Sequence, residues 1–384
     1  MVTFKNRSVN LVYIHAGLQA LVMHGGEAFV FVYLLKAGLS APVVLLCIAT
    51  MFASRMFFRS FVTPVVLRFG LRKTLIVSVI IEGATYLMLP MISTVGPLLI
   101  AYLALWAISS SFYWTTYHAY VAQVGNNEHR GTQVSTMEFI GMLTGVGAPL
   151  LMSFLLTWFS PWVGFAFIAA MMFLAALPFV FGPEVAILRE AEVPQSSKRL
   201  ARLLLFTDGL RSAGLHFIWL IVLFLTLGSS YAAFGGALAL AGATGAVMGL
   251  FVGRWIDLGK GVHAARIGYG AMLLSAVAKC FGFSLPWTAV VANTMTTAAW
   301  PSYATSFNSQ IYNLARQSPC ALRFHVVAEG GWDLGMAVGC SFAAALVYAG
   351  HGYFWALSVG FVGCVLGYFV LVPTLTTAGE PNAE

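Results

Sequence analysis

The sequence predicts an all-α polytopic membrane protein with about 12 transmembrane helices, arranged as two six-helix pseudo-repeats. Three observations support this fold class. The chain of 384 residues is 60% hydrophobic and only 9% charged, whereas about a quarter of the residues in a soluble domain carry charge. Its apolar runs are long enough to cross a bilayer, which takes about 20 residues each. Positive charges also collect on alternate connections between these runs.

The apolar runs, separated by Pro, Gly and charged residues, define the expected helices in order. They lie near residues 10–36, 41–66, 73–92, 96–123, 132–158, 161–182, 207–228, 231–253, 264–284, 287–312, 323–349 and 352–374. In lipid each backbone amide needs a partner within its own segment, so we expect these unbroken runs to be helical. The five cysteines show no C-x-x-C spacing, which favours a packing role over a metal site.

The orientation follows from the Lys and Arg residues, because short cytoplasmic loops carry the positive excess. Alternate connections hold Lys5, Arg7, Arg68, Arg72, Lys73, Arg130, Arg189, Lys198, Arg199, Arg202, Arg254, Lys260, Arg266, Arg316 and Arg323. The opposite connections hold only Lys36. We therefore expect a protein of the cytoplasmic (inner) membrane with both the N and C termini in the cytoplasm. Because the net charge of +7 is spread over these loops, we expect no nucleic-acid partner.

The longest polar stretch lies midway along the chain and divides it into two halves. We expect an N-terminal six-helix bundle at 1–182, a cytoplasmic linker at 183–206 and a C-terminal six-helix bundle at 207–384. The sequence Trp114-Thr-Thr-Tyr117 in the fourth span matches Trp300-Pro-Ser-Tyr303 in the tenth. Such matches between corresponding helices favour a 6+6 repeat of the kind found in transporters.

Two loops carry a recognisable motif of the form G-x-x-x-D-R-x-G-R-[RK]. The loop after the second span keeps Arg68, Gly70, Arg72 and Lys73. Leu67 replaces the Asp of the motif there, whereas the loop after the eighth span keeps Gly253 and Asp257. By these loops and its layout the chain resembles the major facilitator superfamily. The resemblance implies alternating access by rocking of the two halves, a cavity lined by the first, fourth, seventh and tenth spans, and a cytoplasmic latch that Asp257 could serve.

Four charged residues stand inside apolar spans and are expensive in a membrane unless they have a role. Arg55 and Arg59 lie in the second span and Glu329 and Asp333 in the eleventh, each pair at i, i+4 and so on one helix face. The superfamily packs these spans together in antiparallel directions. We expect the gating ion pairs Arg59–Glu329 and Arg55–Asp333, which form in one access state and break in the other. The alternative is a permanent network that only fixes packing.

A second set of ionisable residues is a candidate for coupling transport to protons. His24 and Glu27 lie near mid-membrane in the first span, at the helical rise of about 1.5 Å per residue. A charged carboxylate is costly there, so Glu27 is the first candidate for taking up and releasing a proton, together with Glu138 and His24. The alternative is that Glu27 simply pairs with Arg55. Glu82 is a weaker candidate, since the third span is peripheral in the superfamily.

The fourth and tenth spans are too polar for lipid contact, and their aromatic residues suggest a binding site. The expected substrate-binding residues are Trp114, Tyr117, His118, Asn293, Trp300 and Tyr303. Aromatic walls with a few polar groups suit a neutral or amphipathic organic ligand. The alternative is that these side chains only fill gaps between closely packed helices. Asp208 and Arg211 follow the expected start of the seventh span at 207 and should lie too near the cytoplasmic end to be central.

The resulting hypothesis is a secondary active transporter that moves a small organic solute by alternating access, coupled to protons. We expect a monomer in the lipid bilayer without cofactor or metal, and no enzyme activity. The chain contains no nucleotide-binding P-loop. The chief rival is an intramembrane metal-dependent enzyme that uses the i, i+4, i+8 stripe His325, Glu329 and Asp333. A third possibility is a non-transporting sensor or scaffold on the same fold.

Overall fold

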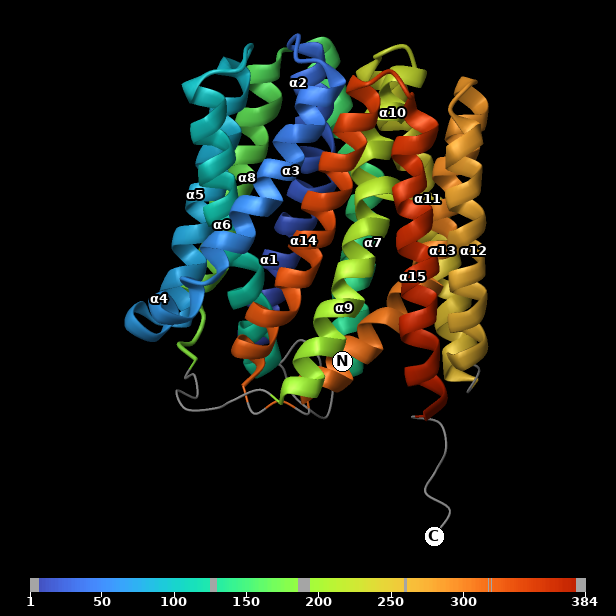
Figure 1. Cartoon of the computed structure of the whole chain (residues 1–384). Coiled ribbons are helices and arrows are strands. Elements are labelled where there is room, and N and C mark those ends of the chain that lie inside the picture. The colour runs from blue at the N-terminus through green and yellow to red at the C-terminus, as the bar shows by residue number, and fades with distance from the viewer. Residues whose placement is uncertain are drawn as a thin grey trace.

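The computed structural model describes residues 7–124, 130–185, 194–258, 261–316, 318 and 320–377. Every regular element within these residues is a helix, and the longest helices run side by side (Figure 1). The predicted all-α fold class is therefore confirmed.

The first half of the chain forms six helical rods. They are α1 (Arg7–Leu21) continued by η2 (Val22–Glu27) and α2 (Ala28–Lys36), α3 (Ala41–Arg59) followed by α4 (Val62–Phe69), α5 (Leu71–Met88) with η3 (Leu89–Met91), α6 (Pro97–Val124), α7 (Arg130–Trp158) and α8 (Pro161–Phe181). Prolines stand at the first turns of α3, α6 and α8. Proline is well tolerated at such a position because its missing N–H would have had no helical partner.

The second half repeats this arrangement. Its rods are α9 (Gln195–Ser212) continued by η5 (Ala213–Ile218) and α10 (Trp219–Thr226), then α11 (Tyr231–Asp257), α12 (Gly261–Gly282), α13 (Pro286–Arg316), α14 (Ala321–Tyr348) and α15 (Tyr353–Thr377). The first rod of each half contains one π-helical segment of six residues, η2 and η5. Segments of this kind are rare and often mark functional positions.

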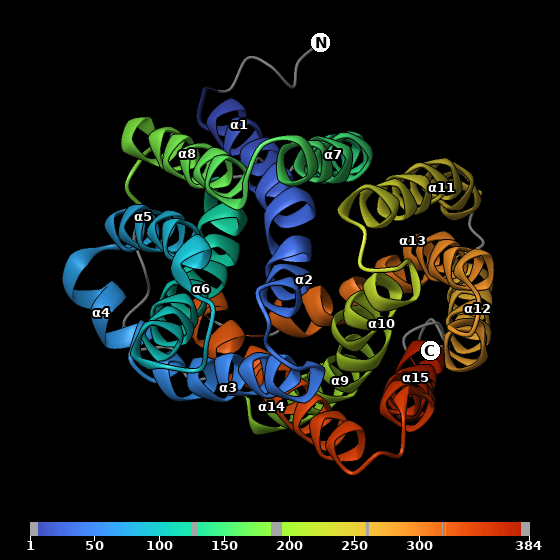
Figure 2. The same cartoon turned by 90° about the horizontal axis from the view of Figure 1, so that it is seen from above.

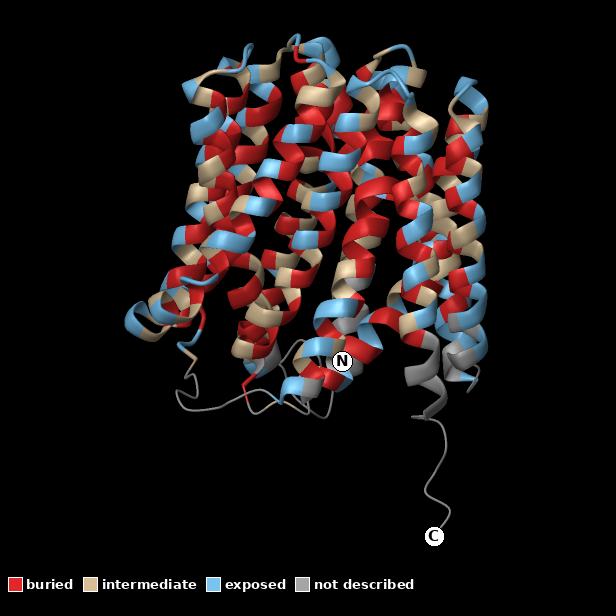
Figure 3. Cartoon of the chain, in the orientation of Figure 1, coloured by how far each residue is buried: buried red, intermediate tan, exposed pale blue. Residues whose placement is uncertain are grey.

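Ten of the rods in the described residues are long and apolar enough to cross a membrane. The two others, α12 and α13, lie alongside them and have similar lengths (Figure 1). α13 is rich in Asn, Thr and Ser between Asn293 and Asn308, which lowers its hydropathy. The bundle exposes many large apolar side chains, among them Phe57, Phe154 and Phe369. Exposed residues occur along the outer helices over their whole length (Figure 3). A surface of this kind suits lipid rather than water.

The ends of the bundle are defined by the order of the rods. α1 begins, α8 ends, α9 begins and α15 ends at the same end, which we call the linker end; the opposite end is the far end (Figure 1). α9 begins at Gln195, twelve residues before the expected span start at 207. The sequence from Gln195 onwards follows Pro194 and consists mostly of good helix formers such as Lys, Arg and Leu. The helix therefore extends into the stretch expected to be linker.

The two most extensive contacts between the halves are each made by one pair of helices. α3 packs against α14, which we call the polar seam, and α7 packs against α11, which we call the glycine seam. At the glycine seam, Gly242 of α11 lies so close to α7 that an added β-carbon would be 2.5 Å from the Gly145 carbonyl oxygen. Seen from above, α2 and α10 lie near the middle of the bundle (Figure 2). At the far end Lys36 Nζ donates to the Ser229 carbonyl, 3.1 Å away, and so links the halves there too.

Candidate functional site

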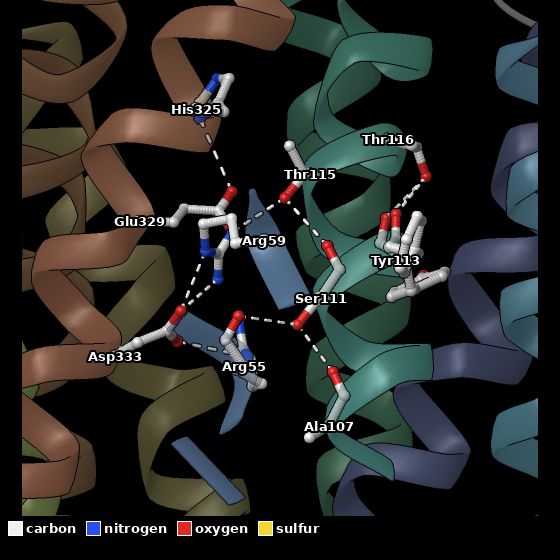
Figure 4. A network of polar contacts seen from close by, with 11 residues as sticks. Arg55, Arg59, Ala107, Ser111, Tyr113, Thr115, Thr116, His325, Glu329 and Asp333 are labelled. Atoms are coloured by element: carbon white, nitrogen blue, oxygen red, sulfur yellow. Dashed lines mark hydrogen bonds and ion pairs between the residues drawn. The ribbon is translucent and has the colours of Figure 1, made fainter. Parts of the chain in front are cut away.

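The polar seam contains a network of four buried charges from the two halves of the chain. Arg55 and Arg59 project from α3, and Glu329 and Asp333 project from α14 (Figure 4). Their i, i+4 spacing places each pair on one helix face. The two arginines on α3 therefore face the two acids on α14. Arg59 Nη1 lies 2.5 Å from Glu329 Oε2, and Arg55 Nε lies 3.2 Å from Asp333 Oδ1. The structure thus brings together both expected pairs.

Arg59 is the centre of this network because it binds both acids. Its Nε and Nη2 donate to Asp333 Oδ2 at 2.9 and 2.6 Å, in addition to the Nη1 contact with Glu329. Nη1 also donates to the Thr115 hydroxyl of α6 at 2.8 Å. A planar guanidinium with five fixed donors suits such a shared arrangement. Arg59 therefore contacts both Glu329 and Asp333, whereas the sequence predicted two separate ion pairs.

Arg55 is held differently from Arg59. Its guanidinium carbon lies 5.3 Å from the ring centre of Phe52, 5.9 Å from Trp106 and 5.6 Å from Trp332. Its Nε faces Asp333 as an ion pair without an aligned hydrogen bond. The cation is thus stabilised by aromatic faces as well as by the carboxylate. The sequence spacing gave no sign of this aromatic cage.

The network is almost dry. Asp333 is 0% exposed, Arg59 2% and Arg55 5%. Breaking a buried pair by removing one partner costs about 3–5 kcal/mol, because the other charge stays buried without compensation. Any movement that separates α3 from α14 must therefore bring in water or new partners.

The stripe His325, Glu329 and Asp333 does not act as a unit. The Asp333 and Glu329 carboxylates both form ion pairs with Arg59. His325 Nδ1 lies 3.8 Å from Glu329 Oε1. The His325 ring stacks on His118 of α6 instead. Within the described residues, no three His, Cys, Asp or Glu side chains gather closely enough to hold a metal ion. The arrangement therefore gives no support to the metal-dependent enzyme.

In the fourth span, Trp114 and Tyr117 pack among aromatic neighbours. Tyr117 stacks on Tyr113 with ring centres 5.4 Å apart, and Trp114 lies edge-on to Tyr113 at 5.1 Å. Both expected binding residues are partly buried against the core of the first half. Tyr113 in turn hydrogen-bonds His15 Nε2 at 2.7 Å. This side of the expected site is an aromatic cluster in contact with the α1 helix.

A second cluster lies in the second half and was not expected from the sequence. Arg211 Nε donates to Asp208 Oδ1 at 2.7 Å, and the same oxygen accepts from the Tyr303 hydroxyl at 2.7 Å. Trp332 Nε1 donates to the other Asp208 oxygen at 3.1 Å. The Arg211 guanidinium lies over the Trp300 ring at 5.0 Å. This cluster joins α9, α13 and α14 through one carboxylate.

The expectation that Asp208 and Arg211 lie near the end of the seventh span is wrong. Because α9 begins at Gln195, Arg211 lies sixteen residues along the helix, or about 24 Å. It is near the middle of the candidate span from Ser197 to Thr226. The error came from treating the charged residues up to Arg202 as linker and placing the start of this span after them. Trp300, close to the middle of α13, is 44% exposed beside this ion pair.

The remaining expected residues have mixed surroundings. Asn293 is buried, and its Oδ1 accepts from Trp219 Nε1 at 3.0 Å. The Glu27 carboxylate forms no ion pair or hydrogen bond with the described residues, since Arg55 pairs with Asp333 instead. His24 is an exposed residue of η2, and its ring lies beside Gly145 of the glycine seam. The side chain of Glu138 lies outside the described residues.

The loop motif forms a turn at the linker end. Gly70 has φ +88°, a conformation that favours glycine, and it separates α4 from α5. Arg72 Nε lies 3.3 Å from Glu184 Oε2, and Arg72 Nη1 donates to the Gly182 carbonyl at 2.9 Å. Arg72 therefore ties the α4–α5 turn to the end of α8. Of the other motif residues, Arg68, Lys73 and Gly253 are exposed, and the side chain of Asp257 lies outside the described residues.

The two six-rod halves and the buried charges between them are typical of a membrane transporter. Residues 18–322 match the family described as Major Facilitator Superfamily. The chain belongs to this superfamily, which confirms the resemblance seen in the sequence. A comparison with curated proteins gave no match.

Solved structures support the same fold. A POT family transporter in complex with 5-aminolevulinic acid superposes with a TM-score of 0.73 at 13% identity, covering 97% of this chain and 97% of that one. The peptide transporter POT in complex with sulfate gives 0.69 at 14% identity, covering 97% and 95%. Identities this low show the fold alone. By family and fold the chain is a secondary transporter, and the superfamily comprises transporters rather than enzymes.

Proposed function

We propose that this protein moves a small neutral or amphipathic organic solute across the cytoplasmic membrane by alternating access, coupled to protons. The observation that carries the proposal is the buried network of Arg55, Arg59, Glu329 and Asp333 between α3 and α14. It joins the two halves of the chain through contacts that can exist only while the polar seam is closed. The linker end is the cytoplasmic side in this proposal, because the Lys and Arg residues gather there.

The network would act as the gate of the linker end. α14 begins at this end, so Glu329 lies eight residues, or about 12 Å, inside it. Opening this side requires α14 to move away from α3, which separates Arg59 from both carboxylates. Substrate binding must supply the differential free energy that favours the open or the closed state. The contact of Lys36 with Ser229 would serve the opposite gate at the far end.

The cluster around Arg211 supports the proposed substrate class. Arg211 is paired with Asp208, so the cluster carries no net charge of its own. The half-exposed Trp300 ring and the Tyr303 ring both lie against the guanidinium. A compensated ion pair beside an accessible indole favours a neutral, zwitterionic or amphipathic solute over a multiply charged anion. Trp300 is the residue that we expect to touch the substrate.

Proton coupling is assigned to the first rod. Glu27 has no ionic partner among the described residues, and it is the last residue of the π-helical segment η2 that also carries His24. A partly buried carboxylate without a counter-ion is stabilised when it holds a proton or when a partner arrives. Glu27, with Glu138 and His24, would thus take up a proton in one access state and release it in the other.

The test is ligand-dependent proton movement. Purified protein is reconstituted in liposomes with an internal pH dye, and pools of metabolites and drugs are added under an imposed pH gradient. We expect one pool to drive proton flux in the wild type, and Glu27→Gln to lose this flux while solute binding persists. Unchanged flux in Glu27→Gln would remove Glu27 from the mechanism. Solute uptake without any proton flux would point to a uniporter and overturn the proposed coupling.

A further inference from the structure

Glu82 of α5 is a buried carboxyl group without a hydrogen-bond partner for one of its oxygens. The side chain is 2% exposed, and Oε2 has no partner among the described residues. Burial of an unpaired ionised carboxylate is among the most costly arrangements in a protein. Native structures contain few buried polar groups without a hydrogen-bond partner. Each one calls for an explanation, such as a bound water, an ion or a proton. From the sequence, Glu82 was a weak candidate for proton coupling because its helix is peripheral in the superfamily.

Tyr86 lies one turn further along α5, on the same face as Glu82. Its hydroxyl group is buried and has no hydrogen-bond partner among the described residues. The hydroxyl points at the π-helical segment η2: a β-carbon added to Gly26 would lie 3.2 Å from the Tyr86 oxygen. This face of α5 therefore packs on η2 at the residue directly before Glu27. The absence of a side chain at Gly26 is what allows the phenol to approach so closely.

The charges near Glu82 do not neutralise it. Glu82 lies within electrostatic reach of Glu27 and Arg55, and both carboxylates lie within electrostatic reach of the phenols of Tyr86, Tyr102 and Tyr113. Arg55 is already committed to Asp333 across the polar seam. Glu82 is buried and Glu27 is partly buried, and two nearby carboxylates repel each other when both are ionised. We therefore expect one proton to reside on the pair.

The second half of the chain has a related arrangement. Lys279 of α12 is 1% exposed, and its Nζ donates to the carbonyl of Leu215 in η5 at 2.6 Å. In the second half, a buried ionisable side chain of the third rod thus contacts the π-helical segment of the first rod. In the first half, the third rod approaches that segment through Tyr86, one turn from Glu82.

We propose that Glu82 and Glu27 form a carboxyl pair that shares one proton beside η2, close to the unpaired Tyr86 hydroxyl. This inference rests on the proposed proton coupling and extends it by a second carboxyl group. In the transfer step, the O–H bond of the Glu82 carboxyl group breaks and an O–H bond forms on the Glu27 carboxylate. The proton is the only species that moves. Glu82 holds it inside the first half, and Glu27 passes it to the space between the halves.

The test reads the protonated carboxyl group directly and needs no substrate. Infrared spectra of the purified protein in lipid are recorded at neutral pH, and the C=O stretching band of protonated carboxyl groups is compared among variants. We expect the band in the wild type, its loss in the Glu27→Gln/Glu82→Gln double variant, and a changed titration midpoint in each single variant. Glu184→Gln, at a partly exposed carboxylate of the linker end, is the matched control and should leave the band unchanged.

Two outcomes would overturn the pair. A band of full intensity in the double variant would place the proton elsewhere, and a band that titrates identically in Glu82→Gln and the wild type would exclude Glu82. Size-exclusion profiles and thermal unfolding identify variants that fail to fold, and Glu82→Asp then replaces Glu82→Gln. Ligand-driven proton flux should fall at least tenfold in Glu82→Gln. Loss of the band with unchanged flux would overturn the transfer role of Glu82, independently of the proposed transport.

Discussion

His118 of α6 and His325 of α14 stack face to face, with ring centres 5.2 Å apart and planes inclined by 24°. They belong to different halves of the chain and lie beside Glu329, whose Oε1 has no hydrogen-bond partner among the described residues. α6 thus takes part in the polar seam twice, through this stack and through the bond from Arg59 to Thr115. The contact between the halves at the polar seam therefore involves α6 as well as α3 and α14.

Asp333→Asn should destabilise the protein strongly. The substitution leaves Arg55 and Arg59 in a dry seam with one carboxylate between them, at a cost of about 3–5 kcal/mol. Thermal unfolding of the purified protein measures the effect. The matched control is Glu184→Gln, which removes the partner of Arg72 where the two side chains are 45% and 30% exposed. Exposed pairs contribute about 0–1 kcal/mol, so the control should unfold close to the wild type.

The same network can be tested by exchange of charges. Arg59→Glu alone should abolish transport, and the double variant Arg59→Glu/Glu329→Arg should restore part of the stability. If the exchange restores stability while transport stays lost, the network only fixes packing. Equal activity of Arg59→Ala and the wild type would remove the gate from the mechanism.

Gly242→Ala should force the glycine seam apart. A β-carbon at this position would meet the Gly145 backbone at 2.5 Å, and backbone cannot move aside as a flexible side chain can. We expect a lower unfolding temperature and at least a tenfold loss of transport. The control is Gly236→Ala in the same helix, where an added β-carbon has no atom within 4 Å. Equal unfolding temperatures and equal transport in Gly242→Ala and Gly236→Ala would contradict the close contact at the glycine seam.

Tyr303→Phe should cost about 1.5–3 kcal/mol, because the phenol donates a 2.7 Å hydrogen bond to the buried Asp208 carboxylate. Thermal unfolding again measures the loss. Tyr13→Phe is the matched control, since the Tyr13 hydroxyl is buried without a partner among the described residues. Its removal should be neutral or slightly stabilising. A larger loss in Tyr13→Phe than in Tyr303→Phe would contradict the structure of the Arg211 cluster.

A metal chelator should change neither stability nor transport. His325 stacks on His118, and Arg59 engages both acids of the stripe, so no ligand set is free for a metal ion there. Elemental analysis of the purified protein should find no stoichiometric metal. A stoichiometric metal that disappears in His325→Ala would revive the enzyme hypothesis.

The orientation can be tested by cysteine labelling. All five native cysteines are buried, so the background should be low. A membrane-impermeant maleimide should label Ser93→Cys, exposed at the far end, in intact cells. Gln195→Cys, exposed at the linker end, should react only after the membrane is permeabilised. The reverse pattern would invert the proposed topology.

The sequence predicted the helical class and the contact of Arg55 and Arg59 with Glu329 and Asp333, since i, i+4 spacing and antiparallel helices fix such a register. It could not predict that Arg59 binds both acids, because this depends on how far α14 slides along α3. The depth of Arg211 was misjudged because Lys198, Arg199 and Arg202 suggested a loop where the structure has the first turns of α9. The packing of Tyr86 on Gly26 joins residues sixty positions apart, and no local pattern signals it.

The contact of Gly242 with the Gly145 backbone involves no side chain, whereas movement at the polar seam has to break several short charge-assisted bonds. In the proposed alternating-access cycle the slow step would therefore belong to the polar seam. The activation enthalpy of turnover should then report the rupture of the Arg59 contacts, with the glycine seam as the pivot.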